Sequence, residues 1–186
     1  MTGSITIKGR DNAIGSLLLI DGGVSFLSSN VVLRDNKLIS SINNNGGAVT
    51  IRKTNLFAFS AFNMLGGTIT GNSAVNGGGV YVDDGSYFTM EGGIISGNTA
   101  IQRGGGVFIN NSNFEMNSGI IYGFSSGSNS NNADINQSPA GHAIYSRSMG
   151  LLPPNDIYDT LYINSTVSDN ISVTSTGLVT GNWNFQ

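Results

Sequence analysis

Cysteine is absent from the 186-residue sequence, proline occurs three times, and histidine occurs once. Without cysteine the chain forms no disulfide bond and offers no thiolate for catalysis or metal binding. The single histidine, His142, has no neighbouring partner from which a Ser-His-Asp set or a Cys/His metal site could be built. We therefore expect a protein without a cofactor.

Charge is also scarce, since only 10% of the residues are charged and the net charge is −3. The 8 lysines and arginines are scattered along the sequence, which is not typical of a nucleic-acid-binding protein, and we expect no such partner. The longest apolar run, "LLLI" at 17–20, is far too short to cross a bilayer. We therefore expect no membrane insertion by this segment.

Glycine, asparagine and serine are abundant, with 27 glycines, and 39% of the residues are hydrophobic. Glycine and asparagine tolerate the left-handed backbone of tight turns, and the apolar residues between them are regularly spaced. This combination indicates many short strands joined by turns rather than a disordered linker.

Three similar segments, "SAFNMLGGTITGN" (60–72), "SYFTMEGGIISGN" (86–98) and "SNFEMNSGIIYGF" (112–124), begin 26 residues apart. A fixed period of this size indicates a solenoid, a propeller or an array. Each unit holds three short segments in which apolar and polar residues alternate, and none has helical periodicity. We predict an all-β, right-handed, single-stranded parallel β-helix of roughly six to seven rungs, each of 25–26 residues. Residues 1–186 would form one domain, with the clearest repeats at 46–124.

Stacked rungs place equivalent side chains about 4.8 Å apart, so identical residues should form columns. The predicted inward columns are Val49/Val80/Val107/Ile144, Ile51/Val82/Ile109, Phe62/Phe88/Phe114, Met64/Met90/Met116 and Ile69/Ile95/Ile121. Gly67, Gly93 and Gly119 should stack at a corner that leaves no room for a side chain. Asn72 and Asn98 should form an amide ladder in a turn.

Two insertions interrupt the period, the apolar loop at about 55–59 and the polar, low-complexity loop at 123–140. Loops on a rigid scaffold often carry binding sites. The segment 147–186 departs from the repeat, and its stretches 160–167 and 181–186 resemble strands that close the end of the core. The start, "MTGSITIKGRDN", has no targeting signal and lies in mid-repeat, so we expect a fragment of a longer protein.

The motifs "GGAV" (46–49) and "GGGV" (77–80 and 104–107) resemble those of bacterial polymorphic outer-membrane proteins, which repeat GGA[ILV] and FxxN tetrapeptides. The stretches 66–74 and 77–100 are similar to the repeat units of other bacterial surface β-helix proteins, among them autotransporter-passenger adhesins. The resemblance covers roughly residues 16–146, although the FxxN motif is poorly kept. It implies a secreted or surface-exposed adhesin or antigen.

A carbohydrate-active enzyme is the main alternative, because "VDDG" (Asp83, Asp84) and "GHA" (His142) superficially resemble polygalacturonase motifs. Glycoside hydrolysis requires two carboxyl groups that face each other across a cleft. In the predicted register His142 lies two rungs beyond Asp83 and Asp84, roughly 10 Å along the axis and at another corner. The simpler interpretation is that Asp83 and Asp84 occupy a turn and form ion pairs with Arg52 and Lys53. They remain weak candidates for a Ca²⁺ site.

Two features are candidates for binding. Tyr81, Phe108 and Tyr145 fall in one outward column, and an exposed aromatic row could stack against sugar rings or a partner protein. Alternatively, the column lies beneath the 123–140 loop. The second feature is the apolar loop with its side chains Leu56, Phe57 and Phe59, which could insert into a partner or fold back over the outer wall.

We therefore expect a non-catalytic surface or secreted protein that binds host or environmental glycans or proteins. A polysaccharide lyase or hydrolase and a passive structural stalk are the alternatives. The chain should be a monomer or associate weakly end to end through exposed strand edges.

Overall fold

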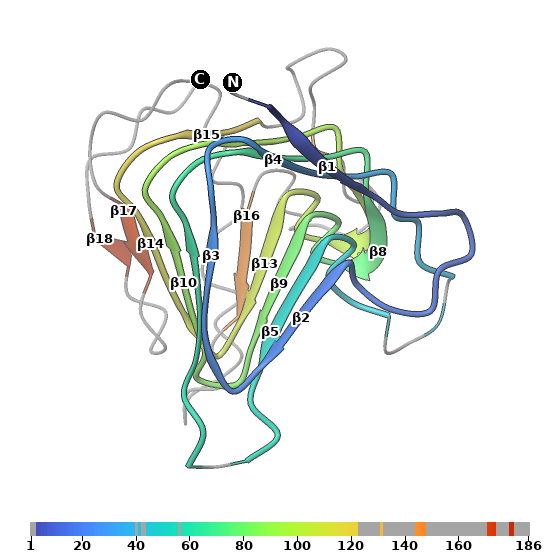
Figure 1. Cartoon of the computed structure of the whole chain (residues 1–186). Coiled ribbons are helices and arrows are strands. Elements are labelled where there is room, and N and C mark those ends of the chain that lie inside the picture. Colours follow the sequence, from blue (N-terminus) through green and yellow to red (C-terminus); the bar gives the residue numbers. More distant parts are fainter. Residues whose placement is uncertain are drawn as a thin grey trace.

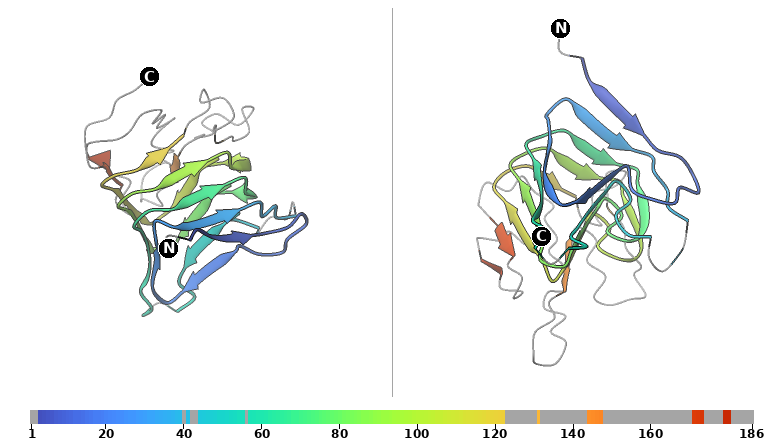
Figure 2. Two further views of the ribbon diagram at one scale, coloured as in Figure 1. Left: turned by 45° about the horizontal axis from the view of Figure 1, so that its top comes forward. Right: turned by 60° about the horizontal axis from the view of Figure 1, so that its bottom comes forward.

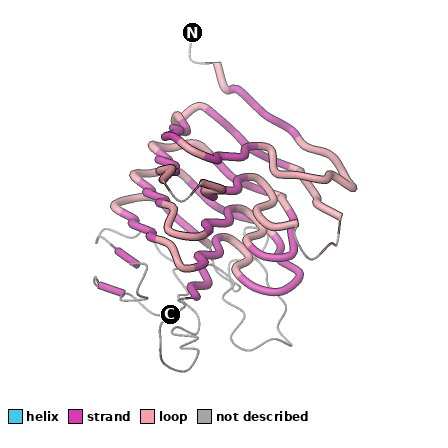
Figure 3. Tube along the Cα trace, turned by 90° about the horizontal axis from the view of Figure 1, so that it is seen from below, coloured by secondary structure: helices cyan, strands magenta, loops and turns pink. Residues whose placement is uncertain are grey.

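The computed structural model describes residues 3–39, 41, 44–55, 57–122, 131, 144–147, 171–173 and 179–180. In these ranges the chain forms strands and no helix, and the strands wind into a solenoid (Figures 1 and 3). None of the described residues lies in a helix long and apolar enough to span a membrane.

Three long sheets form the walls of the solenoid (Figure 1). The first sheet contains β2 (Leu18–Asp21), β5 (Val49–Arg52), β9 (Val80–Asp83), β13 (Val107–Asn110) and β16 (Ile144–Arg147). The second contains β3 (Gly23–Leu27), β6 (Ser60–Met64), β10 (Tyr87–Met90), β14 (Asn113–Met116), β17 (Ile171–Val173) and β18 (Val179–Thr180). The third contains β1 (Ile5–Lys8), β4 (Val31–Arg34), β7 (Thr68–Thr70), β11 (Ile94–Ser96) and β15 (Ile120–Ile121). A short fourth sheet at one corner pairs β8 (Ser73–Asn76) with β12 (Thr99–Arg103).

The solenoid has about four turns rather than the predicted six to seven. Part of the difference arises because 37–51 does not form a turn of its own. Strands β2, β3 and β4 complete one turn within 18–34. Leu38 then bridges Ala13 at the corner, and the next turn begins with β5. The alternation in 37–51 therefore belongs to a corner followed by the start of the next turn.

The predicted inward columns are confirmed. Phe88 pairs in parallel register with Phe62 and Phe114, and its ring centroid lies 5.4 Å and 5.2 Å from theirs. Met64, Met90 and Met116 form the neighbouring column, and all three are fully buried. The valine and isoleucine columns of the other walls are also buried and in the expected register. Identical side chains recur because each fills the same cross-section one strand spacing further along.

The predicted glycine corner is confirmed, and its backbone shows why no larger residue fits. Gly67, Gly93 and Gly119 have positive φ angles of 83°, 96° and 106°. A Cβ atom on Gly93 would lie 2.7 Å from the carbonyl oxygen of Gly67 in the turn below. Both the dihedral angle and the close approach of the neighbouring backbone therefore favour glycine.

The asparagine ladder is confirmed and extends beyond the two predicted residues. The Asn72 amide donates to Asn98 Oδ1 at 2.9 Å, and the Asn98 amide donates to Asn131 Oδ1 at 3.0 Å. At the other end the backbone N–H of Asn36 donates to Asn72 Oδ1 at 3.1 Å. All four side chains are buried, at 0–2% exposure. The ladder therefore supplies hydrogen-bond partners to backbone groups that the bend would otherwise leave unsatisfied.

The two ends of the solenoid differ (Figure 2). At the N-terminal end β1, β2 and β3 are the edge strands of the three sheets, and Ile5 and Ile7 are exposed. At the opposite end β17 pairs with β14 in antiparallel orientation, and β18 pairs with β17. The expected closing segment 147–186 thus contributes β17 and β18. The stretches predicted as closing strands, 160–167 and 181–186, lie outside the described residues.

Candidate functional site

A groove with a volume of about 580 Å³ lies on the outer face of the first sheet. Its floor is formed by outward-facing side chains on three successive strands, Leu19 on β2, Thr50 on β5 and Tyr81 on β9. The parallel register places these three residues side by side across the strands. Arg52 and Asp83, two residues further along their strands, line the same groove.

The wall of the groove comes from the segments that precede β2 and β5. Segment 35–48, between β4 and β5, is longer than the equivalent segment 71–79 between β7 and β9. Its Asn44 and Asn45 line the groove together with Ile14 and Ser16. These side chains flank the outer face of the first sheet and give the site its concave shape.

Hydrogen bonds hold this wall in place. Thr50 Oγ1 donates to the carbonyl oxygen of Asn45 at 2.9 Å and lies 2.7 Å from Ser16 Oγ. The Asn76 amide donates to Asn45 Oδ1 at 3.0 Å, and the backbone N–H of Val75 donates to the Asn44 carbonyl at 2.8 Å. The groove is therefore preformed, which lowers the ordering cost of binding a ligand.

The predicted aromatic column exists, but most of it is not exposed. The ring of Phe108 lies 5.4 Å from that of Tyr81 and 5.1 Å from that of Tyr145, and both pairs are stacked. Phe108 is only 5% exposed and Tyr145 only 1%, so of the two alternatives for this column the exposed row does not apply to these two residues. Tyr81 is half-buried and lines the groove.

Arg103 on β12 accounts for part of this burial. Its Nη1 donates to the Tyr145 hydroxyl at 2.8 Å, and its guanidinium carbon lies 4.9 Å from the centre of the Tyr145 ring. A cation in this position is attracted by the face of the ring while its side chain covers the aromatic surface. Alternation alone identifies the outward face of β13 and β16, but it gives no information about a side chain that reaches over from the corner.

Asp83 and Asp84 occupy the end of β9 and the turn that follows it. Asp84 has a positive φ of 46° and is exposed, as expected for a turn residue. Asp83 Oδ1 accepts a hydrogen bond from the Asn110 amide at 2.7 Å and lies 3.4 Å from the Tyr81 hydroxyl. Among the described residues no group of three or more His, Asp or Glu side chains could hold a metal ion. His142 lies outside these residues.

The ion pairs expected between these acids and Arg52 or Lys53 are not formed. Arg52 Nε instead contacts Asp21 Oδ2 at 3.2 Å, because Asp21 on β2 is its register neighbour. Asp83 has Asn110 as its register neighbour on β13 and accepts a hydrogen bond from its amide. Arg52 therefore forms an ion pair with an acid of the preceding turn, whereas the prediction placed its partner in the following turn.

The loop between β5 and β6 is the second candidate site, and it projects at the bottom of Figure 1. Asp21 Oδ1 accepts hydrogen bonds from the backbone N–H and hydroxyl of Thr54 at 2.9 and 3.0 Å. At the other end the backbone N–H of Gly22 donates to Ser60 Oγ at 2.7 Å. The pKa of Asp21 is lowered, mainly because the hydrogen bond from the Thr54 backbone N–H favours the charged carboxylate.

The two described phenylalanines of this loop differ in their surroundings. Phe57 is 97% exposed, whereas Phe59 is 53% exposed and its ring lies 5.1 Å from that of Tyr87 on the outer wall. Phe59 thus folds back over the outer wall, as one of the two alternatives predicted, whereas Phe57 projects into solvent. Leu56 and, apart from Asn131, the 123–140 loop lie outside the described residues.

Comparisons with protein-family models, with curated proteins and with solved structures find no significant match to this chain. The likeness to polymorphic outer-membrane proteins and passenger adhesins therefore stays a prediction from short motifs.

Proposed function

We propose that the chain is a non-catalytic glycan-binding module of a bacterial surface-exposed or secreted protein. The observation that carries this proposal is the preformed groove, in which the half-buried ring of Tyr81 lies beside hydrogen-bonding side chains from Asn45 and Thr50. Sugar rings present apolar C–H faces and a rim of hydroxyl groups, and an aromatic floor with an amide wall complements both. The location at the surface follows from the family resemblance alone.

The carboxylates near the groove favour binding over hydrolysis. Among the residues that line the groove only Asp83 carries a carboxylate, and the Asn110 amide occupies one of its oxygens. Hydrolysis by paired carboxyl groups needs a second acid across the substrate, at about 5–10 Å depending on the mechanism. This arrangement supports a binding role, and the enzyme alternative is tested by a search for cleavage products.

The experiment measures retention of the full chain on a panel of immobilised polysaccharides, together with an assay for released oligosaccharides. We expect retention without release, and loss of retention in the Tyr81→Ala variant. Tyr87→Ala is the matched control, because Tyr87 is also partly exposed, at 42%, but lies on the second sheet away from the groove. Release of oligosaccharides that is abolished by Asp83→Asn would identify an enzyme instead.

A protein partner is the second candidate function, and the exposure of Phe57 favours it. An almost fully exposed phenylalanine on a loop whose base is fixed by Asp21 and Ser60 is suited to inserting into an apolar pocket of a partner. The test compares adhesion of wild type and Phe57→Ser to host cells treated with protease or with glycosidases. Adhesion that is lost after protease treatment and in Phe57→Ser supports this function. If neither the groove nor this loop binds, the stalk alternative remains.

A further inference from the structure

We propose that the ligand of this groove is an anionic polysaccharide, whose acidic groups contact a cationic cluster formed by Lys8, Arg10, Arg34 and Lys37. This inference rests on the proposed glycan-binding function and names the class of glycan. Three observations support this inference. The fold brings these four residues close together, they carry an excess of positive charge, and adjacent hollows lead from them to Tyr81.

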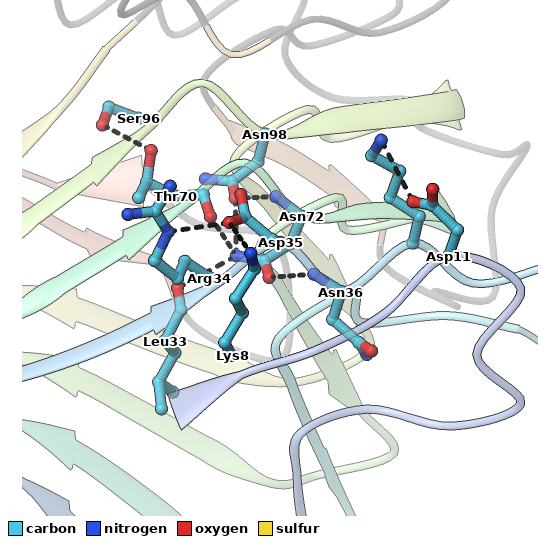
Figure 4. A network of polar contacts seen from close by, with 11 residues as sticks. Lys8, Asp11, Leu33, Arg34, Asp35, Asn36, Thr70, Asn72, Ser96 and Asn98 are labelled. Atoms are coloured by element: carbon cyan, nitrogen blue, oxygen red, sulfur yellow. Dashed lines mark hydrogen bonds and ion pairs between the residues drawn. The ribbon is translucent and has the colours of Figure 1, made fainter. Parts of the chain in front are cut away.

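Basic residues that are scattered in the sequence are brought together by the solenoid. Lys8 ends β1 and pairs in register with Arg34 at the end of β4, one turn away (Figure 4). The backbone N–H of Lys37 donates to the carbonyl oxygen of Arg10 at 3.0 Å, so the residues that follow the two strands are also neighbours. Half of the 8 lysines and arginines of the chain thus lie at one corner.

The cluster retains positive charge after its ion pairs are counted. Asp35 lies 2.8 Å from Arg34 Nε and 3.9 Å from Lys8 Nζ, and Asp11 lies 3.1 Å from Lys37 Nζ. Four cations and two carboxylates leave an excess of two positive charges, in a chain whose net charge is −3. The side chains of Lys8, Arg34 and Lys37 are 69%, 48% and 57% exposed, so they are accessible to a ligand.

Two hollows connect this cluster to the groove. The first, of about 390 Å³, is lined by Lys8, Arg10, Lys37 and the two acids. The second, of about 460 Å³, shares Lys8 and Arg10 with the first and shares Ile14, Gly15 and Ser16 with the Tyr81 groove. The shared residues place successive hollows next to one another, and this row of three hollows, called the track, has cations at one end and an aromatic ring at the other.

The chemistry of this track favours a polymer of acidic sugars. A chain of sugar rings could stack on Tyr81 while its carboxylate or sulfate groups lie several residues away against the cations. A nucleic acid would place a phosphate at every nucleotide, and two excess positive charges neutralise few of them. The acidic remainder of the protein would repel any polyanion, which directs an anionic glycan to this corner.

The test measures the affinity of the full chain for three soluble polymers at low and high salt. Polygalacturonate carries carboxylates, its fully methyl-esterified form is neutral, and heparin carries sulfates in addition to carboxylates. We expect polygalacturonate to bind at least about tenfold more tightly than the ester at low salt, with this advantage lost at high salt. Tighter binding of heparin would identify sulfate as the preferred group.

The decisive variant replaces Lys8, Arg10 and Lys37 together by glutamine. Lys53→Gln, which removes one positive charge outside the track, is the charge-matched control for the single variant Lys8→Gln. We expect the triple variant to bind polygalacturonate as weakly as wild type binds the ester, while its affinity for the ester is unchanged. Equal binding of polygalacturonate by the triple variant and Lys53→Gln would overturn the inference. Circular dichroism shows whether the variant is folded, and Lys8→Gln alone provides a milder substitution.

The two levels of the proposal fail in different ways. If Tyr81→Ala loses both polymers while the triple variant keeps polygalacturonate binding, the glycan function stands and the anionic specificity is wrong. If the triple variant loses polygalacturonate while Tyr81→Ala binds it normally, the cluster is an independent anion site and the proposed track is wrong. Tighter binding of single-stranded DNA than of any glycan would overturn both.

Discussion

Asp21 on β2 accepts hydrogen bonds from both the backbone N–H and the hydroxyl of Thr54, which begins the loop of the next turn. One carboxylate of the first turn therefore fixes the base of the loop that displays Phe57. The equivalent position in that first turn is a single residue, Gly22, between β2 and β3. The insertion between β5 and β6 is thus anchored by a residue of the preceding turn, which has no insertion at this position.

This anchor predicts a pH dependence of the loop. The pKa of Asp21 lies below its usual value of 3.8, chiefly because of the Thr54 backbone N–H. A group whose pKa is lowered in the folded state contributes stability that is fully present above pH 3.8 and is lost as the pH falls through the lowered pKa. We expect the Thr54 amide resonance to titrate with a midpoint below 3.8 in an NMR experiment. The Asp21→Asn variant should show no such transition, and a midpoint at or above 3.8 would contradict the assignment.

The asparagine ladder predicts a large loss of stability on truncation of Asn98. Asn98→Ala removes the acceptor of two Asn72 donors and the donors to Ile69 and Asn131, in a fully buried site. We expect the free energy of unfolding in urea to fall by about 3 kcal/mol, because buried partners are left unsatisfied. Asn63→Ala, on the outer side of β6, should change it by less than about 0.5 kcal/mol. Equal effects of the two substitutions would show that the ladder contributes little.

The corner glycines predict a steric effect that depends on position. Gly93→Ala places a Cβ 2.7 Å from the Gly67 carbonyl at a φ of 96°, and we expect a destabilisation of about 2 kcal/mol or more. Gly15→Ala, at which a Cβ has no atom within 4 Å and φ is not positive, should be neutral. The comparison is made by thermal unfolding of the two variants. A tolerated Gly93→Ala would mean that the corner backbone relaxes.

The phenylalanine column predicts a contrast between two residues of the same type. Phe88→Ala removes a ring packed between those of Phe62 and Phe114 in the core, and it should cost about 3–5 kcal/mol of unfolding free energy. Phe57→Ala should have no measurable effect, because that ring is 97% exposed. Similar costs in chemical denaturation would indicate that Phe57 packs against the protein in solution.

The solenoid could be predicted because the sequence repeats the constraint that each turn imposes on the next. Phe62, Phe88 and Phe114 lie 26 residues apart and are register neighbours in the structure. The same step separates Lys8 from Arg34, which could have identified the cationic cluster. The cluster is not apparent when basic residues are counted along the sequence, because its members come from equivalent positions of successive turns.

Other features depend on contacts that periodicity does not encode. Arg103 reaches from the corner onto Tyr145 and covers part of this residue, which has an outward position on β16 and is only 1% exposed. Asn36 and Asn131 join the ladder although neither follows a glycine, as Asn72 and Asn98 do. The groove depends on Asn44 and Asn45 lying beside the outer face of the first sheet, and periodicity does not predict where residues between two strands lie.

The asparagine ladder has a consequence for how the chain selects one alignment of its turns. A slip of one residue between neighbouring turns would expose the core, but a slip of two would keep every apolar side chain facing inwards. Alternation therefore does not distinguish the native alignment from its two-residue neighbours. The ladder does, because Asn72 meets Asn98 only when the two turns are aligned as they are. The four buried asparagines thus select one register among alignments that hydrophobic alternation alone would allow.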